Sequence, residues 1–255
     1  MRKTIYLIII TLATVACIIL GAFHFIGGFA DGLFGGLFSK GSAVSEVLFD
    51  DGASEGITSI RMEGEVMEVN LQTGDKFQIS YKGNKDLKPE IQEEDGALTI
   101  IQKGKAGRHW FGINDNRCDL TVVVPADQEL EQLSCNMNVG DLNFSGVKCA
   151  KTDLTADVGD LDISSMDLGE SRIHMNTGDL DVENCTFSAL DISNNAGDVE
   201  VKTIDPAESY SLDLKTDIGD VEISGRDVGK SYMQDADGPK ITIRNNVGDV
   251  EVSRG

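Results

Sequence analysis

The chain has 255 residues, of which 43 are acidic and 22 are basic, and its formal net charge is −21. This charge excludes a nucleic-acid-binding protein that neutralises phosphates, because such proteins need a basic surface. Hydrophobic residues make up 40% and charged residues 25% of the chain, which is typical of a folded protein. The 28 glycines indicate many short turns, and no pair among the 5 cysteines has the spacing of a zinc site.

The first thirty residues predict a membrane anchor. Arg2 and Lys3 precede an uncharged stretch from Thr4 to Ala30, and its densest part, Ile5 to Leu20, is almost wholly aliphatic. About 20 such residues cross the hydrocarbon layer as a helix, and the two positive charges would stay in the cytoplasm. We therefore expect a single-pass protein of the cell membrane, with one N-terminal transmembrane helix, a cytoplasmic N-terminus and an extracellular C-terminal domain.

Two alternatives for this segment remain open. A cleaved signal peptide would usually have an apolar region of only about 7 to 15 residues. Lipidation at Cys17 would use the sequence Val15-Ala16-Cys17, although the apolar run continues beyond it.

A Gly-Asp dipeptide recurs through the second half of the chain at steps of 19, 19, 19, 22 and 29 residues. The six copies are Gly140-Asp141, Gly159-Asp160, Gly178-Asp179, Gly197-Asp198, Gly219-Asp220 and Gly248-Asp249. An Asn or Asp stands two residues before each glycine, at Asn138, Asp157, Asn176, Asn195, Asp217 and Asn246. Such a period is typical of solenoids and other repeat architectures.

Each repeat predicts a strand, a glycine corner and a second strand. Apolar and polar residues alternate on both sides of the glycine, so the apolar side chains share one face. The corner needs glycine if its φ is positive. One repeat is too small to bury its apolar face alone, so neighbouring repeats have to stack. We therefore expect an all-β fold, a parallel β-solenoid of the β-helix kind with coils of about 19 residues.

Four segments follow from these patterns. Residues 1–30 form the anchor, and residues 31–44, rich in Gly and Phe, form a juxtamembrane linker. Strand-like segments with less regular spacing follow, so we interpret residues 45–130 as the N-terminal coils and cap of the solenoid. Residues 131–255 form the Gly-Asp repeat solenoid itself.

The segment Leu120 to Pro125 (LTVVVP), then a short polar link, Leu133 and the Gly-Asp coils, resembles the putative-adhesin family. This is a bacterial β-strand-repeat group described as a domain of unknown function. The likeness covers roughly residues 45 to 255 and implies a cell-envelope protein, often membrane-tethered, with no catalytic motif. Some relatives act in envelope-stress signalling, but no stress-regulator domain is visible here.

Stacking of the coils would place acids in two columns. The first column is Asp141, Asp160, Asp179, Asp198, Asp220 and Asp249, and the second is Asn143, Asp162, Asp181, Glu200, Glu222 and Glu251. Neighbouring charges would repel by roughly 1 kcal/mol in water and by more near a protein surface. Either these acids form turns and face solvent, or they bind Ca²⁺, which prefers several oxygen ligands. No other cofactor is expected.

The Asn and Asp residues two before each glycine would form a third column. No two aspartates are adjacent in it, so every carboxylate has amide neighbours that can donate hydrogen bonds. We expect a side-chain ladder along the corner.

The sequence offers little for catalysis. The three histidines, His24, His109 and His174, suggest no nucleophile and base pair. The acids repeat uniformly rather than converging on one cleft, so we expect no enzyme activity, with a polysaccharide-active β-helix enzyme as the alternative. Cys118, Cys135, Cys149 and Cys185 are interpreted as buried thiols, or as disulfides between neighbouring coils.

Two segments are candidate interaction sites. A loop contains Arg108, His109, Trp110 and Phe111, and such residues are frequent anchors of protein interfaces. The last coil is expected to be an open end that could self-associate by strand addition. We therefore interpret the protein as a non-catalytic envelope module that binds or senses an unknown protein or glycan partner, with a calcium-binding structural ectodomain as the alternative.

Overall fold

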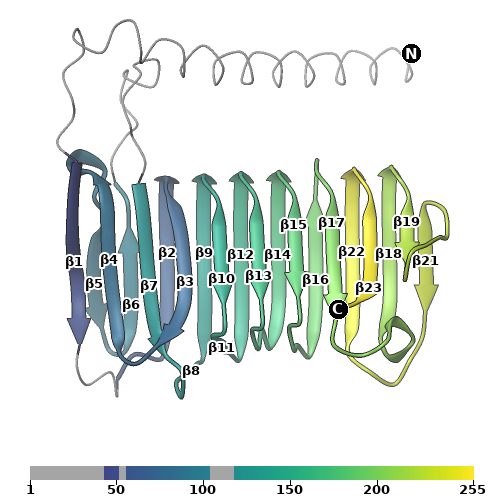
Figure 1. Ribbon diagram of the computed structural model, residues 1–255, viewed down its shortest axis with the longest axis horizontal. Helices are drawn as coiled ribbons and strands as arrows, with labels where there is room; N and C mark the ends of the chain where they lie inside the picture. Colours follow the sequence, from purple (N-terminus) through teal and green to yellow (C-terminus); the bar gives the residue numbers. More distant parts are fainter. Residues whose placement is uncertain (1–42, 52–55, 104–117) are drawn as a thin grey trace, which may run out of the picture. The chain divides into compact units, whose positions relative to one another are not determined.

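Strands dominate the part of the chain that the computed structural model describes, residues 43–51, 56–103 and 118–255 (Figure 1). The predicted anchor and nearly all of the predicted linker lie outside these residues. Within them, no helix has the length and apolarity needed to cross a membrane. The all-β class is confirmed.

Two large sheets carry the fold. Sheet A has eleven strands in the order β1 (Ala43–Asp51), β4 (Phe77–Asn84), β7 (Cys118–Pro125), β3 (Glu68–Gly74), β10 (Leu142–Ser145), β13 (Leu161–Ser164), β15 (Leu180–Glu183), β17 (Val199–Thr203), β23 (Val250–Arg254), β19 (Val221–Ile223) and β20 (Arg226–Asp227). Sheet B has ten strands in the order β21 (Ser231–Gln234), β18 (Ser211–Ile218), β22 (Lys240–Val247), β16 (Ala189–Asn194), β14 (Glu170–Thr177), β12 (Lys151–Val158), β9 (Gln132–Val139), β2 (Ser59–Val66), β6 (Ala97–Ile101) and β5 (Glu90–Glu94). The short strands β8 (Glu129–Leu130) and β11 (Lys148–Cys149) pair with each other, and η1 (Lys85–Leu87) and η2 (Ala207–Ser209) are single 3₁₀ turns.

Each Gly-Asp repeat contributes one strand to each sheet. The strand before the corner glycine lies in sheet B and the strand after it lies in sheet A. Successive repeats pair in parallel and in register, so that Leu142 pairs with Leu161 and Leu161 with Leu180. Equivalent side chains of neighbouring repeats therefore lie one strand apart, about 4.8 Å.

The apolar side chains of both sheets meet in one hydrophobic cluster. Leu142 and Leu180 from sheet A and Ile173 and Ile243 from sheet B are each 0% exposed. The alternation in the sequence predicts this inward face, because side chains along a strand point alternately to its two sides. Burial of this continuous core is the main favourable contribution to folding.

The order of the last two repeats differs from their order in the sequence. Strand β22 pairs with β16 on one side and with β18 on the other, and β23 lies between β17 and β19 in the same way. The last repeat, in yellow in Figure 1, is thus inserted between the fourth and the fifth. The expectation that the last coil is an open end is therefore wrong.

The reason lies in the segment that joins the two repeats. After β19 the chain forms β20 and β21, which pair antiparallel with β19 and β18 on their outer sides. These strands occupy the outer edge of the fifth repeat. The following repeat can therefore pair only on the inner side, next to β16 and β17.

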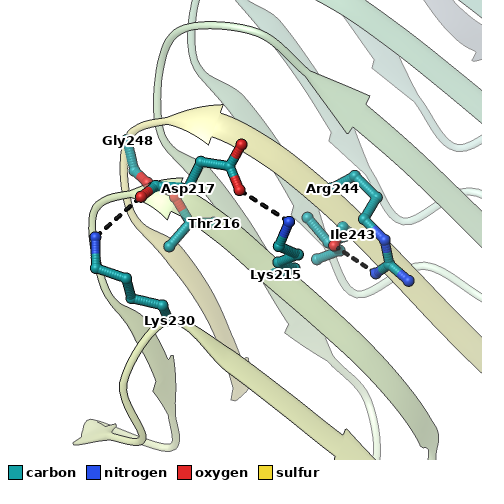
Figure 2. A network of polar contacts seen from close by, with 7 residues as sticks. All are labelled: Lys215, Thr216, Asp217, Lys230, Ile243, Arg244 and Gly248. Atoms are coloured by element: carbon teal, nitrogen blue, oxygen red, sulfur yellow. Dashed lines mark hydrogen bonds and ion pairs between the residues drawn. The ribbon is translucent and has the colours of Figure 1, made fainter. Parts of the chain in front are cut away.

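Side chains join the inserted repeat to its outer neighbour (Figure 2). Arg244 Nη1 donates to Asp213 O at 2.7 Å, and Thr216 Oγ1 donates to Gly248 O at 2.8 Å. Lys230, in the segment before β21, donates from Nζ to Asp217 O at 2.9 Å. These contacts connect β18 to β22, to the corner before β23 and to the start of the outer segment.

The N-terminal part also departs from simple coils. Strands β2 and β6 pair in parallel, as do β3 and β7. However, β4 pairs antiparallel with β1 and β7, and β5 pairs antiparallel with β6. Residues 45–130 therefore contain reversed strands, and the interpretation of this segment as coils holds only for part of it.

Cross-linking can test the inserted repeat. Glu200 and Glu251 are direct neighbours, whereas Glu251 separates Glu200 from Glu222. We expect Glu200→Cys/Glu251→Cys to form a disulfide under mild oxidation, because neighbouring strands bring Cα atoms within the range of about 4.4–6.8 Å that a disulfide needs. Glu200→Cys/Glu222→Cys should not cross-link, since two strand spacings are about 10 Å. Mass spectrometry of non-reduced peptides distinguishes the pairs, and the reverse result would indicate stacking in sequence order.

Candidate functional site

The six corner glycines line one edge of the stack. Their φ values lie between 128° and 143°, the region predicted for them from the sequence. The structure adds a second reason for glycine. A Cβ on Gly178 would lie 2.0 Å from the carbonyl oxygen of Gly159, and a Cβ on Gly197 would lie 1.9 Å from that of Gly178. The corners thus approach so closely that a side chain has no room.

The aspartates after these glycines accept hydrogen bonds from the neighbouring repeat. Asp160 N donates to Asp141 Oδ1 at 3.0 Å and Asp179 N donates to Asp160 Oδ1 at 2.9 Å. The same bond recurs from Asp198 to Asp179, from Asp249 to Asp198 and from Asp220 to Asp249. Hydrogen bonds to an ionised acceptor are stronger than neutral ones, so they offset the repulsion along the column. These aspartates therefore have a structural role.

The ladder of side chains two residues before each glycine is also present. Asn176 Nδ2 donates to Asp157 Oδ1 at 2.6 Å, Asn195 Nδ2 to Asn176 Oδ1 at 2.6 Å and Asn246 Nδ2 to Asn195 Oδ1 at 2.7 Å. At the N-terminal end, Asn138 Nδ2 donates to Glu65 Oε2 at 2.9 Å. The ladder follows the stacking order, so Asn246 bonds to Asn195 and not to Asp217.

Substitution of a corner glycine tests the close approach. Gly178→Ala should lower the free energy of unfolding by more than about 2 kcal/mol, because strained backbone and a contact with a carbonyl oxygen add together. Gly229 is a matched control, since its φ is also positive at 88° but no atom lies within 4 Å of its Cβ position. Gly229→Ala should cost only about 1 kcal/mol. Urea unfolding measures both, and equal losses would show that the carbonyl contact contributes nothing.

The second acidic column lies on the outer face of sheet A. We call it the carboxylate column, and in stacking order it contains Asp162, Asp181, Glu200, Glu251 and Glu222. Burial, then the charges of Glu200 and Asp162, raise the pKa of Asp181. Lys202 forms an ion pair with Glu200 at 2.9 Å, and this contact raises the pKa of Lys202. The column is thus a site of charge repulsion that is only partly offset.

The carboxylate column runs across five strands in a line and does not surround a point. Within residues 43–51, 56–103 and 118–255, no three His, Cys, Asp or Glu side chains are placed to hold a metal ion. Neither acidic column provides the arrangement that the calcium alternative requires.

Removal of one charge from the carboxylate column should stabilise the protein at neutral pH. Because the pKa of Asp181 is raised in the folded state, its ionised form opposes folding above that pKa, and this cost disappears as the pH falls toward the ordinary value of 3.8. Asp181→Asn should raise the Tm by roughly 1–3 °C at pH 7 and by less near pH 4. Asp235→Asn, in an exposed loop, is the control and should leave the Tm unchanged. A lower Tm for Asp181→Asn at pH 7 would contradict this account.

One pair of side chains resembles part of a catalytic site, and the sequence analysis missed it. His174 Nδ1 lies 2.7 Å from Ser193 Oγ, on neighbouring strands of sheet B. The residues beside the pair in the same row are Thr155 and Arg244, so no acid stands there to orient the histidine. The spacing of 19 residues between His174 and Ser193 could have revealed the pair, had the outer rows of the stack been written out.

The four cysteines of the body are all buried and free. Burial raises the pKa of Cys135 and of Cys149 to about 12. The thiolate is the reactive form, so these thiols are inert at neutral pH. The alternative of disulfides between coils is therefore wrong.

The remaining predicted sites fall in two groups. Arg108, His109, Trp110 and Phe111 lie outside the residues that the structure describes. The C-terminal coil lies inside both sheets, so its strands are already paired on both sides.

A hollow of about 260 Å³ lies on the outer face of sheet B. It extends across β12, β14, β16 and β22. Its lining is Lys151, Thr152, Glu170, Ser171, Arg172, Ala189, Leu190, Asp191, Lys240 and Thr242. The lining is mostly polar, and it contains no aromatic side chain.

Residues 57–254 match the family model of the Toastrack domain, DUF4097. The chain belongs to this family. The match includes all of the Gly-Asp repeats, and it confirms the resemblance to the putative-adhesin family. Toastrack is thus the family of the body, and DUF4097 denotes a domain of unknown function.

Solved structures similar to this Toastrack chain come from several bacteria. A putative cell adhesion protein from Clostridium sporogenes is 14% identical, with 84% of this chain and 99% of that chain covered and a TM-score of 0.46. A putative adhesin from Bacteroides fragilis is 15% identical over 84% and 100% of the two chains, with a TM-score of 0.43. A putative lipid binding protein from Parabacteroides distasonis is 14% identical over 84% and 98%, with a TM-score of 0.35. No curated protein sequence matches this chain.

Proposed function

We propose that this Toastrack protein is a membrane-anchored module of the cell envelope that binds a partner without catalysis. The observation that carries the proposal is the register of the stack. Each outward position of a repeat recurs at one strand spacing in the next, so both sheets present long rows of polar side chains on a rigid backbone. Such a surface can contact an extended partner at several points, as the surfaces of other repeat proteins do.

The arrangement of the polar groups favours binding over catalysis. The corner aspartates and the Asn ladder use their acceptors within the stack. Ser193 and His174 form a pair, but its row supplies no third group to orient the base. The backbone N–H groups on either side are engaged in the ladders of sheet B, so they do not form an oxyanion hole there.

The anchor comes from the sequence. The uncharged stretch from Thr4 to Ala30, preceded by Arg2 and Lys3, supports a single-pass topology with the body outside the cell. The first strand begins at Ala43, so the linker is short and would hold the body near the membrane surface. The family resemblance to envelope proteins agrees with this topology.

Labelling of intact cells tests the topology. Met233 is 77% exposed, whereas the body's four cysteines are buried. In bacteria that produce the full chain, Met233→Cys should react with a membrane-impermeant maleimide before lysis, and the unsubstituted chain should not. Labelling of Met233→Cys that occurs only after lysis would place the body inside the cell and overturn the proposal.

A further inference from the structure

The hollow on sheet B arises from one small side chain in a row of long ones. Along this row the neighbouring residues are Lys151, Glu170, Ala189 and Lys240. Glu170 and Lys240 stand on either side of Ala189, about 10 Å apart across two strand spacings. Arg172 and Asp191 form the adjacent row. The methyl group of Ala189 therefore leaves a space with charged walls.

Three cations of the hollow have no acidic partner. Lys151, Arg172 and Lys240 are exposed, and none of them makes an ion pair with any residue that the structure describes. Many other basic side chains of the body are paired, as in Lys76 with Asp50 and Lys88 with Glu46. In a chain with a net charge of −21, acids for pairing are abundant. Three unpaired cations around one hollow are thus available for a ligand.

The inserted repeat brings the third cation to this place. Lys240 is the neighbour of Ala189 because β22 lies next to β16. In a stack that followed the sequence order, Ser211 of the fifth repeat would occupy that position instead. The hollow with its three cations therefore depends on the departure from sequence order.

The acidic face of the protein lies on the other sheet. The carboxylate column belongs to sheet A, and packed sheets are about 10 Å apart. The Debye length at physiological ionic strength is about 8 Å, so much of the repulsion from that face is screened at the hollow. An anion at the hollow would encounter mainly the local charges, three cations against Glu170 and Asp191.

We propose that this hollow binds an acidic glycan, a sugar polymer that carries carboxylate or phosphate groups. Lys151, Arg172 and Lys240 bind the anionic group, and Glu170 and Asp191 accept hydrogen bonds from sugar hydroxyls. The volume of about 260 Å³ accommodates one charged sugar unit, and the open row along the strands lets the polymer continue on both sides. This assignment rests on the proposed envelope-binding function and names its ligand class.

The chemistry of the lining favours this class over other ligands. A neutral glycan usually stacks on aromatic rings, and the lining contains none. A sheet edge would be needed to add a peptide strand, whereas the hollow lies across four paired strands. Arginine binds carboxylate and phosphate groups in a bidentate manner, which suits Arg172 to either anion.

The test measures binding of fluorescent polymers to the full chain in detergent micelles by anisotropy, at 0.15 M salt. The probes are polygalacturonic acid, which carries carboxylates, poly(glycerol phosphate), which carries phosphates, and dextran, which is neutral. We expect at least one acidic polymer to bind, more weakly as salt rises, and dextran not to bind. The two acidic probes distinguish a carboxylate ligand from a phosphate ligand.

Two variants and two matched controls locate the site. Arg172→Gln should weaken binding roughly tenfold, because it removes a charged hydrogen-bond donor, and Ala189→Glu should weaken it at least as much by filling the hollow with an anion. Arg226→Gln is the control for the first, since Arg226 is exposed on sheet A. Ala97→Glu is the control for the second, since Ala97 is exposed on β6 of the same sheet, five strands away from β16. Both controls should bind as the parent chain does, and melting curves verify that all four fold.

Two outcomes would overturn the assignment: neither acidic polymer binds, or Ala189→Glu binds as tightly as Ala97→Glu. These results leave the envelope topology untouched, because the maleimide labelling reports it independently. Conversely, a body found inside the cell would overturn the proposed function while binding at the hollow could still be measured.

Discussion

The in-register contact between corner glycines is the constraint on which the rest of the structure depends. The carbonyl oxygen of one glycine occupies the place where a side chain of the next would stand. This approach lets each corner donate to its neighbour, as Gly140 N does to Val158 O at 2.9 Å and Gly159 N to Thr177 O at 3.0 Å. Because the backbones are held at this distance, the side chains on both sides of the corner must align in rows.

Alignment in rows has opposite effects for different side chains. Asparagine has both a donor and an acceptor, so a column of asparagines bonds to itself. An aspartate gains when its oxygen faces a backbone N–H, as at the corner. A carboxylate that faces only carboxylates loses, as the raised pKa of Asp181 indicates. The same geometry therefore stabilises the corner edge and stores repulsion on the face of sheet A.

Much of this could be predicted from the sequence, because the relevant interactions lie one repeat apart. The corner glycines, the Asn ladder and the two acidic columns all follow from a spacing of 19 residues. The order of the last two repeats could not be predicted in this way. Each repeat offers the same two pairing edges, so the choice is made by the outer strands β20 and β21, whose sequences carry no repeat signal. The reversed strands β4 and β5 were missed for the same reason.

The candidate site divides along the same line. Lys151, Glu170 and Ala189 follow one another at 19 residues and could have been placed in one row from the sequence. Lys240 could not, since 51 residues separate it from Ala189 and its neighbour is set by the insertion. The pair of His174 and Ser193 was within reach of the repeat, but the analysis had considered only the corner and its acids.

The inserted repeat also has a consequence for biosynthesis. A ribosome releases the strands of the fourth and fifth repeats well before those of the sixth, yet the sixth pairs with both. Until residue 254 has emerged, β16 and β18 each lack a hydrogen-bonded neighbour, and unpaired strand edges promote aggregation. Assembly of this end of the body is thus coupled to completion of the polypeptide, and a prematurely terminated chain would expose the edges that chaperones and proteases of the envelope recognise.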